Sequence, residues 1–294
     1  MTTLSTLWEI ESPLGPVAFR VSGQGRPVIF LHGWGASSRY WQAAPAFLPD
    51  YRLIAIDLPG CGASPAPLEP ITLTSYARTV LAVADALGID RFALAGHSLG
   101  AAVALATSGL AQERVERLVL ISFGFSANLY EESLVTIAGA QWQVAAAWWR
   151  PWLLCWRPWW EVTHNWRRAW WTLPPTPELL ARPMVRRPLD SSLLAQGIAD
   201  LVVMDPLVAI ESAAIIGHPQ LKRVLQRPLP PVLLISGRND PVFPLANVMA
   251  LSRYLRDVQV VFIPDCGHVP MVEEPATCYQ TIAQFLDREN DYLS

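Results

Sequence analysis

The sequence predicts an α/β protein in which a mostly parallel sheet is flanked by helices and interrupted by one helical insertion. Two observations lead to this fold class. Short β-branched or apolar runs alternate with helical stretches as far as residue 122, which is typical of parallel strands joined by crossover helices. The strand pattern then disappears for roughly a hundred residues and returns before the end of the chain.

The expected strands are short, and two helices have clear signals. Before the insertion we expect strands at residues 17–21, 27–31, 52–56, 92–95 and 117–122, and after it at 231–236 and 258–263. Apolar residues at helical spacing predict a helix over residues 73–87, which ends at Gly88. A last helix is expected over residues 275–286, where Pro275 suits a first helical turn.

The chain divides into a core in two parts and an insertion. Residues 1–123 and 216–294 form the α/β core, and residues 124–215 form the insertion. A chain of 294 residues with 52% hydrophobic content can bury a core large enough for one compact domain with an insertion. Two small domains are the alternative.

Charge and composition exclude some classes of function. With a net charge of -3 and 16% charged residues, the chain has no basic field for nucleic acid. Residues 1–23 lack the basic start, apolar run and cleavage site of a secretory signal. No uninterrupted apolar run reaches the roughly 18 residues that span a bilayer. We therefore expect a cytoplasmic protein without a nucleic-acid partner; its oligomeric state stays open.

The four cysteines predict neither a metal site nor a disulfide framework. Cys61, Cys155, Cys266 and Cys278 lack the paired spacing of a zinc site and are too few for a disulfide scaffold. We expect reduced thiols.

The insertion has an unusual composition. Ten of the 13 tryptophans fall inside it: Trp142, Trp148, Trp149, Trp152, Trp156, Trp159, Trp160, Trp166, Trp170 and Trp171. Proline cannot continue a helix interior, so five prolines are expected to break the segment into short helices: Pro151, Pro158, Pro174, Pro175 and Pro177. The insertion is therefore predicted to be a helical lid.

Ser98 is the candidate nucleophile. It stands in Gly96-His97-Ser98-Leu99-Gly100, between the strand at residues 92–95 and a helical pattern over residues 101–110. A serine in such a strand-turn-helix setting sits in a strained turn, and small neighbours let other backbone come close. The alternative is a glycine-rich turn that opens an ordinary helix.

A serine hydroxyl needs a base and an acid to become reactive. Of five histidines, His268 follows the last strand, where a loop at the carboxyl edge of the sheet can reach Ser98. Asp240 follows the strand before it and is the candidate for the carboxylate that orients His268. Asp265 and Asp205 are weaker candidates for that acid.

The oxyanion formed in acyl transfer needs two N–H donors. The backbone N–H of Leu99, directly after the candidate nucleophile, is one candidate. The second is the N–H of Trp34 in the turn at residues 32–35, where an ordinary glycine-rich turn is the alternative.

Five motifs together resemble the α/β-hydrolase superfamily over nearly the whole chain. They lie at residues 32–35, 57–64, 96–100, 237–240 and 267–268. The resemblance implies a Ser-Asp-His order along the chain and no cofactor or metal. It also sets this chain apart from dehalogenases and epoxide hydrolases of that fold, which have aspartate where this chain has Ser98. The segment at residues 57–64 is expected to be a structural turn.

The expected function is hydrolysis of a carboxylic ester with a sizeable apolar group through an acyl-serine intermediate. The substrate pocket is expected to include His32, Gly33, His97, Phe123, Trp148, Trp149 and Val269. Two alternatives stay open because one scaffold serves many functions. The same residues could cleave a carbon–carbon or amide bond, or the protein could bind or signal with slow turnover.

The lid tryptophans have two interpretations. They could form the core of the lid and the ceiling of the pocket. Alternatively, some face outward and dock on lipid, with Arg150, Arg157, Arg167 and Arg168 meeting anionic headgroups.

Overall fold

A computed structural model describes residues 4, 6–187, 189–216, 218 and 220–288. It contains an eight-stranded sheet in the order β1-β2-β4-β3-β5-β6-β7-β8. The strands are β1 (Thr6–Ser12), β2 (Gly15–Ser22), β3 (Arg26–Leu31), β4 (Tyr51–Ile56), β5 (Phe92–His97), β6 (Val115–Ile121), β7 (Val232–Gly237) and β8 (Val258–Ile263). Strand β2 pairs antiparallel with β1 and β4, and the other neighbours pair in parallel. The mostly parallel sheet predicted from the sequence is confirmed.

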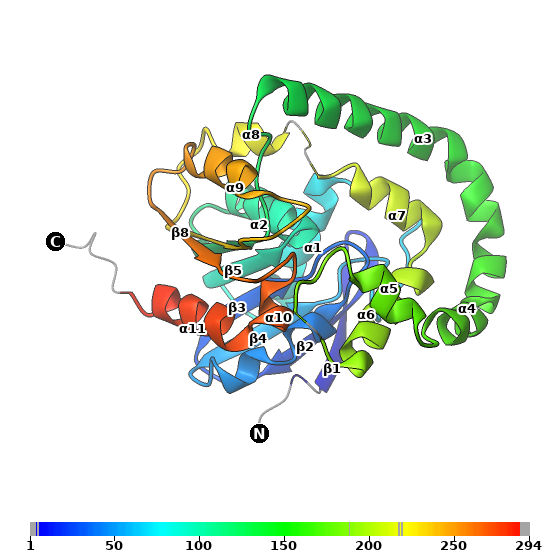
Figure 1. Cartoon of the computed structure of the whole chain (residues 1–294), viewed down its shortest axis with the longest axis horizontal. Helices are drawn as coiled ribbons and strands as arrows, with labels where there is room; N and C mark the ends of the chain where they lie inside the picture. Colours follow the sequence, from blue (N-terminus) through cyan, green and yellow to red (C-terminus); the bar gives the residue numbers. More distant parts are fainter. Residues whose placement is uncertain (1–3, 5, 188, 217, 219, 289–294) are drawn as a thin grey trace.

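Helices cover the sheet and form the insertion (Figure 1). Those of the core are α1 (Leu73–Ala86), α2 (Leu99–Leu110), α9 (Leu245–Ser252), α10 (Pro270–Glu273) and α11 (Pro275–Leu286), with short 3-10 turns at Ser38–Trp41 and Ala44–Ala46. Those of the insertion are α3 (Leu129–Val162), α4 (His164–Trp171), α5 (Thr176–Ala181), α6 (Ser191–Val203), α7 (Pro206–Ala213) and α8 (Gln220–Val224).

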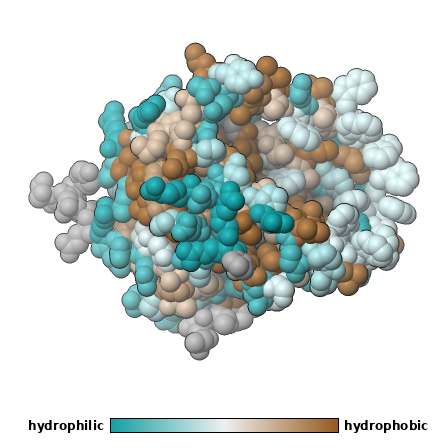
Figure 2. All heavy atoms as spheres, in the orientation of Figure 1, coloured by the Kyte–Doolittle hydropathy of each residue, from teal (hydrophilic) through white to brown (hydrophobic). Residues whose placement is uncertain are grey.

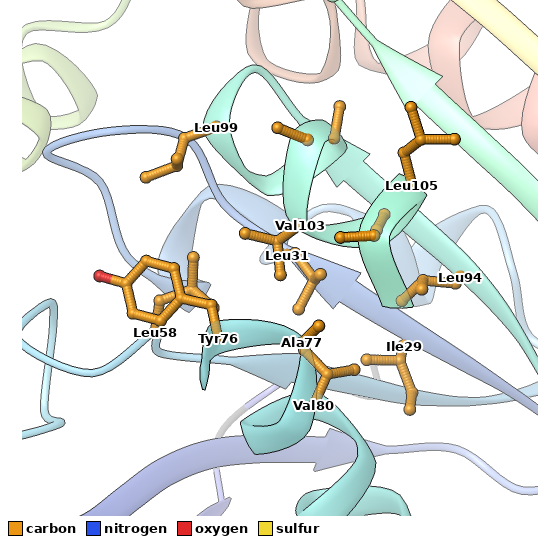
Figure 3. Packing of buried hydrophobic residues seen from close by; sticks show 14 of the residues in the cluster. Ile29, Leu31, Leu58, Tyr76, Ala77, Val80, Leu94, Leu99, Val103 and Leu105 are labelled. Carbon is orange, nitrogen blue, oxygen red and sulfur yellow. The ribbon is translucent and has the colours of Figure 1, made fainter. Parts of the chain in front are cut away.

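The central strands are buried on both faces, because helices cover both sides of a parallel sheet. On one face Ile29 and Leu31 of β3 lie against Tyr76 and Val80 of α1 and Val103 of α2 (Figure 3). The alternate residues of the same strand belong to a second apolar cluster. In that cluster Phe30 packs on Trp41, with ring centroids 4.9 Å apart, and α11 contributes Tyr279 and Ile282.

Strand β1 was not predicted. It forms a hairpin with β2 at the edge of the sheet, and its residues are mostly exposed. An edge strand with one solvated face needs no continuous apolar run, so the sequence Thr6–Ser12 lacks the pattern of the buried strands.

The prediction that proline breaks the insertion into short helices is wrong for its longest element. Helix α3 runs for 34 residues and contains both Pro151 and Pro158. Figure 1 shows that it bends around the side of the molecule. Proline in a helix interior removes one hydrogen bond and kinks the helix. Because the two prolines are seven residues apart, they lie on the same side of the helix, and their kinks add.

Candidate functional site

The candidate residues lie at the carboxyl edge of the parallel strands. Ser98 directly follows β5, Asp240 follows β7, and His268 follows β8. Neighbouring parallel strands end on the same side of a sheet, so their loops meet although the residues are far apart in sequence.

Ser98 occupies a strained turn. Its backbone has φ 52° and ψ −113°, a conformation that residues other than glycine seldom adopt. The turn is so tight that a side chain at Gly96 would collide with the carbonyl of Gly100, and one at Gly100 with the carbonyl of Leu31. The two glycines therefore allow the sharp passage from β5 to α2.

His268 and Asp240 form a buried hydrogen-bonded pair. The Nδ1 of His268 donates to the carboxylate of Asp240 at 2.9 Å and 3.0 Å. The same carboxylate accepts the backbone N–H groups of Val242 and Phe243 at 2.8 Å and 3.1 Å. Burial opposes ionisation, but the hydrogen bond and charge of His268 and the two N–H donors outweigh it, so the pKa of Asp240 lies below its ordinary value.

The two other acids considered from the sequence lie elsewhere. Asp205 caps α7 and forms an ion pair with Arg157 at 2.8 Å. Asp265 is exposed. Of the three acids, Asp240 is the one hydrogen-bonded to His268.

His97 ties the turn of Ser98 to the loop of His268. Its Nε2 donates to the backbone carbonyl of His268 at 2.8 Å, and the two imidazole rings lie 4.9 Å apart. Burial, and the charge of His268, lower the pKa of His97 to about 3, so this ring stays neutral.

A direct hydrogen bond from Ser98 to His268 is not among those of the described residues. Such bonds often tighten only when substrate is bound.

The turn at residues 32–35 approaches Ser98 closely. A side chain on Gly33 would lie 2.6 Å from Nδ1 of His97 and 3.4 Å from Cβ of Ser98. Leu99 is the first residue of α2, so its N–H has no partner within the helix. The turn that carries Trp34 thus lies beside the turn that carries Ser98 and Leu99, and the oxyanion role of the two N–H groups stays a prediction.

This geometry agrees with the comparisons. The sequence profile of the alpha/beta hydrolase fold family matches residues 26–275. The chain belongs to this family. The solved structure of a hydrolase from Pseudomonas aeruginosa PA01 superposes with a TM-score of 0.73 at 24% identity, covering 97% of this chain and 99% of the other.

Two relatives illustrate the range of the family. A pimeloyl-[acyl-carrier protein] methyl ester esterase of Nitrosomonas europaea is 27% identical over 92% of this chain and its own full length. A dihydrolipoyllysine-residue acetyltransferase component of the acetoin cleaving system of Pseudomonas putida is 31% identical over 91% of this chain. The match spans 65% of that second protein.

In this α/β hydrolase His32 has a structural position. It is fully buried, its Nδ1 donates to the carbonyl of Gly33 at 2.8 Å, and its Nε2 accepts the N–H of Leu58 at 3.0 Å. Burial lowers its pKa. Both ring nitrogens are therefore used to hold the turn at residues 32–35 in place.

The remaining predicted pocket residues differ in position. Phe123 is buried against Phe243, whose ring stacks on His268 with centroids 6.3 Å apart. Val269 is half-buried beside His268. Trp148 and Trp149 of α3 are 82% and 54% exposed, and for these two a pocket role stays a prediction.

The lid holds both loops of the site. The indole Nε1 of Trp34 donates to the carbonyl of Ala209 in α7 at 3.0 Å, and the N–H of His268 donates to the carbonyl of Met184 at 2.8 Å. Movement of the lid would therefore reach both the turn at residues 32–35 and the loop of His268.

Glu273 is a residue of the site that the sequence did not reveal. Its buried carboxylate accepts the N–H of Gly267 at 3.0 Å and that of Arg186 in the lid at 2.7 Å. It lies five residues after His268, but its lid partner is 87 residues away in sequence. In the sequence, the signal for Glu273 was limited to its place directly after the apolar residues Met271 and Val272.

Asp57 has the structural role expected of the turn at residues 57–64. Its buried carboxylate accepts the N–H of Ser38 at 2.5 Å and that of Ala63 at 3.0 Å. Each of the four cysteines is free in the structure, and three are buried. A cavity of about 460 Å³ lies between the start of α1 and the helices α3 and α7, and Ser98 does not line it.

Proposed function

We propose that this α/β hydrolase cleaves a carboxylic ester with a sizeable apolar group through an acyl-Ser98 intermediate. One observation carries the proposal: a serine in a strained strand-to-helix turn shares the sheet edge with the buried His268–Asp240 pair. A serine next to a base that is itself held by a third group is the arrangement of nucleophilic acyl transfer.

The chemistry follows from the positions of the groups. Ser98 Oγ attacks the ester carbonyl while Nε2 of His268 accepts its proton. Asp240 holds Nδ1–H of His268 and stabilises the imidazolium that forms. The N–H groups of Leu99 and Trp34 bind the oxyanion. His268 then protonates the leaving alcohol, and a water molecule activated by His268 hydrolyses the acyl-serine.

The ester class is supported from outside the chain as well. The relative from Nitrosomonas europaea that aligns over its full length is named for a methyl ester esterase activity. The apolar ring of Phe243, which stacks on His268 and is backed by buried Phe123, favours an apolar group in the substrate over a charged one.

A substrate panel tests this proposal. The purified protein is assayed against esters of one alcohol graded by acyl length, together with the matching amides and a vinylogous diketone. We expect ester turnover to rise beyond the acetyl ester. Faster turnover of an amide or of the diketone would overturn the ester assignment, and an acyl burst without steady turnover on every ester would indicate a binding or signalling protein.

A further inference from the structure

Tryptophan side chains of the lid face solvent. Nine of the ten are between 42% and 82% exposed, namely Trp142, Trp148, Trp149, Trp152, Trp156, Trp159, Trp166, Trp170 and Trp171. The tenth, Trp160, is half-buried and donates its indole N–H to the carbonyl of Met204 at 3.1 Å. Monomeric proteins seldom expose so many large apolar side chains together. Where such a patch does occur, it marks an interaction site.

The exposed rings are ordered along two helices. On α3, Trp149, Trp152, Trp156 and Trp159 follow one another at helical spacing, with successive centroids 5.7, 5.5 and 6.1 Å apart. On α4, Trp166 and Trp170 stack at 6.1 Å. We call these six residues the aromatic rim. In Figure 2 pale side chains of intermediate hydropathy gather along the side where Figure 1 draws the end of α3 and α4.

The arginines between these tryptophans point inward. Arg150 pairs with Glu211, and Arg157 is buried and pairs with Asp205 at 2.8 Å. Arg167 is buried too: it bonds the carbonyl of Val202 and lies over the ring of Trp160 at 3.4 Å from its centroid. The alternative in which these three arginines meet anionic headgroups does not fit their positions, since each already has a partner inside the protein.

The outward surface of this stretch is close to neutral. Between residues 142 and 171 the exposed charged side chains are Glu161 and Arg168, which carry opposite charges. Electrostatic attraction between this surface and an acidic or a basic partner is therefore weak. A partner must therefore bind this surface through contacts with the indole rings and not through charge.

We propose that the aromatic rim docks the enzyme on the surface of a lipid membrane, at headgroup depth, through its indole rings. Tryptophan favours this depth because one side of the ring system is apolar and its N–H can stay hydrated. Helices with such a face lie in the plane of the interface. Among the described residues no single helix is long and apolar enough to cross a membrane, although the bent pair α6–α7 meets the length and composition limits. This docking is independent of the proposed hydrolysis.

A membrane fits the rim better than a second copy of the chain does. Protein interfaces need a polar margin, with about one hydrogen bond for every 100–200 Å². The rim offers only indole N–H groups, its exposed charged neighbours are Glu161 and Arg168, and the inward arginines of α3 are not available as interface anchors. It also follows a bent helix (Figure 1), and a lipid surface can deform to match it.

Vesicle sedimentation tests the docking with the full chain. We expect the protein to sediment with pure phosphatidylcholine vesicles. Added phosphatidylglycerol and high salt should change the bound fraction little, because screening acts on charge attraction. No binding to phosphatidylcholine, or binding that needs phosphatidylglycerol and is lost in high salt, would overturn the proposal.

A matched pair of triple variants locates the surface. Changing Trp152, Trp156 and Trp159 to Ser should weaken vesicle binding at least about tenfold, since burial of even one such ring exceeds a tenfold effect. The control changes Leu7, Trp8 and Leu110 to Ser, three residues that are about half exposed outside the lid. It should bind as the parent does, and both variants should keep their activity on a short soluble ester.

Three further results test the docking proposal. Equal binding by the rim variant and the parent would overturn the proposal, as would a concentration-dependent dimer of the parent that the rim variant abolishes. Ser98→Ala should bind vesicles like the parent. Its binding separates a failure of the docking proposal from a failure of the proposed hydrolysis.

Discussion

Helices α2 and α3 differ sharply in how much they bury and in which side chains they expose. In α2, which follows Ser98, every residue except Leu110 is buried. In α3, which crosses the lid, Ala146 and Arg157 are the buried residues among 34. The core thus hides its apolar residues and positions the site by packing. Helix α3 turns Arg150 and Arg157 inward, exposes most of its tryptophans and is fixed by ion pairs to α7 and to the loop that precedes α7.

This difference separates two tasks. Chemistry requires groups held within fractions of an ångström, and close packing around α2 and β5 supplies that rigidity. Attachment to a surface requires exposed rings on a support that does not unfold. Changes around α2 and β5 should therefore affect turnover, whereas changes in the exposed rings of α3 and α4 should affect docking and changes in the buried arginines of the lid should affect stability.

The largest expected effect comes from Ser98→Ala. Loss of the nucleophile should lower turnover on every ester by about a millionfold. The fold should persist, because alanine has the same Cβ and no larger side chain. Steady-state rates and the thermal midpoint check this, and activity above a few per cent of the parent would contradict it.

Asp240→Asn should have the next largest effect. The amide no longer fixes the Nδ1–H tautomer of His268 and should lower turnover about ten-thousandfold. Asp265→Asn is the control, because Asp265 is an exposed acid of the neighbouring loop. If the control lost activity and Asp240→Asn did not, His268 would be oriented by a different acid.

The sequence predicted the core well because its signals are local. The strand of residues 92–95 and the two glycines around Ser98 each follow from chain geometry near the residue concerned, whereas the Ser-Asp-His order was what the family resemblance implied. The hydrogen bond between His97 and the carbonyl of His268 was not predictable. It joins residues 171 apart in sequence, and nothing near His97 indicates its partner.

The lid was predicted less well, for a related reason. Proline signals a local defect in a helix, and the sequence does not show that contacts with α7 stabilise a bent helix across Pro151 and Pro158. The inward orientation of the Arg157 side chain likewise depends on its ion pair with Asp205, which is 48 residues further along the chain. Composition revealed the tryptophans, and only the structure revealed which residues face outward.

Breaking the ion pair of Arg157 tests how the lid is held. Arg157→Met leaves the buried carboxylate of Asp205 without its partner and should cost about 3–5 kcal/mol of stability. Arg168→Met, a change at an exposed site, should cost less than about 0.5 kcal/mol. Urea unfolding measures both, and equal losses would show that the ion pair does not hold the lid.

At neutral pH the smallest expected effect is that of His97, whose contribution to stability changes only as the pH falls below 6.5. Burial lowers its pKa from 6.5 to about 3 in the folded protein, so between these values the unfolded chain binds more protons. Stability from this residue is complete above pH 6.5 and falls as the pH drops toward 3, by up to about 1.4 kcal/mol per pH unit. His97→Asn should make the fall of the urea midpoint shallower, and an unchanged slope would contradict the assignment.

Covalent labelling with a fluorophosphonate tests the central claim most directly. The reagent forms a stable bond with an activated serine, and peptide mass mapping locates that bond. We expect one adduct per chain, on Ser98, no adduct in Ser98→Ala, and much slower labelling in Asp240→Asn. An adduct on another serine, or a folded parent protein that does not react, would contradict the account.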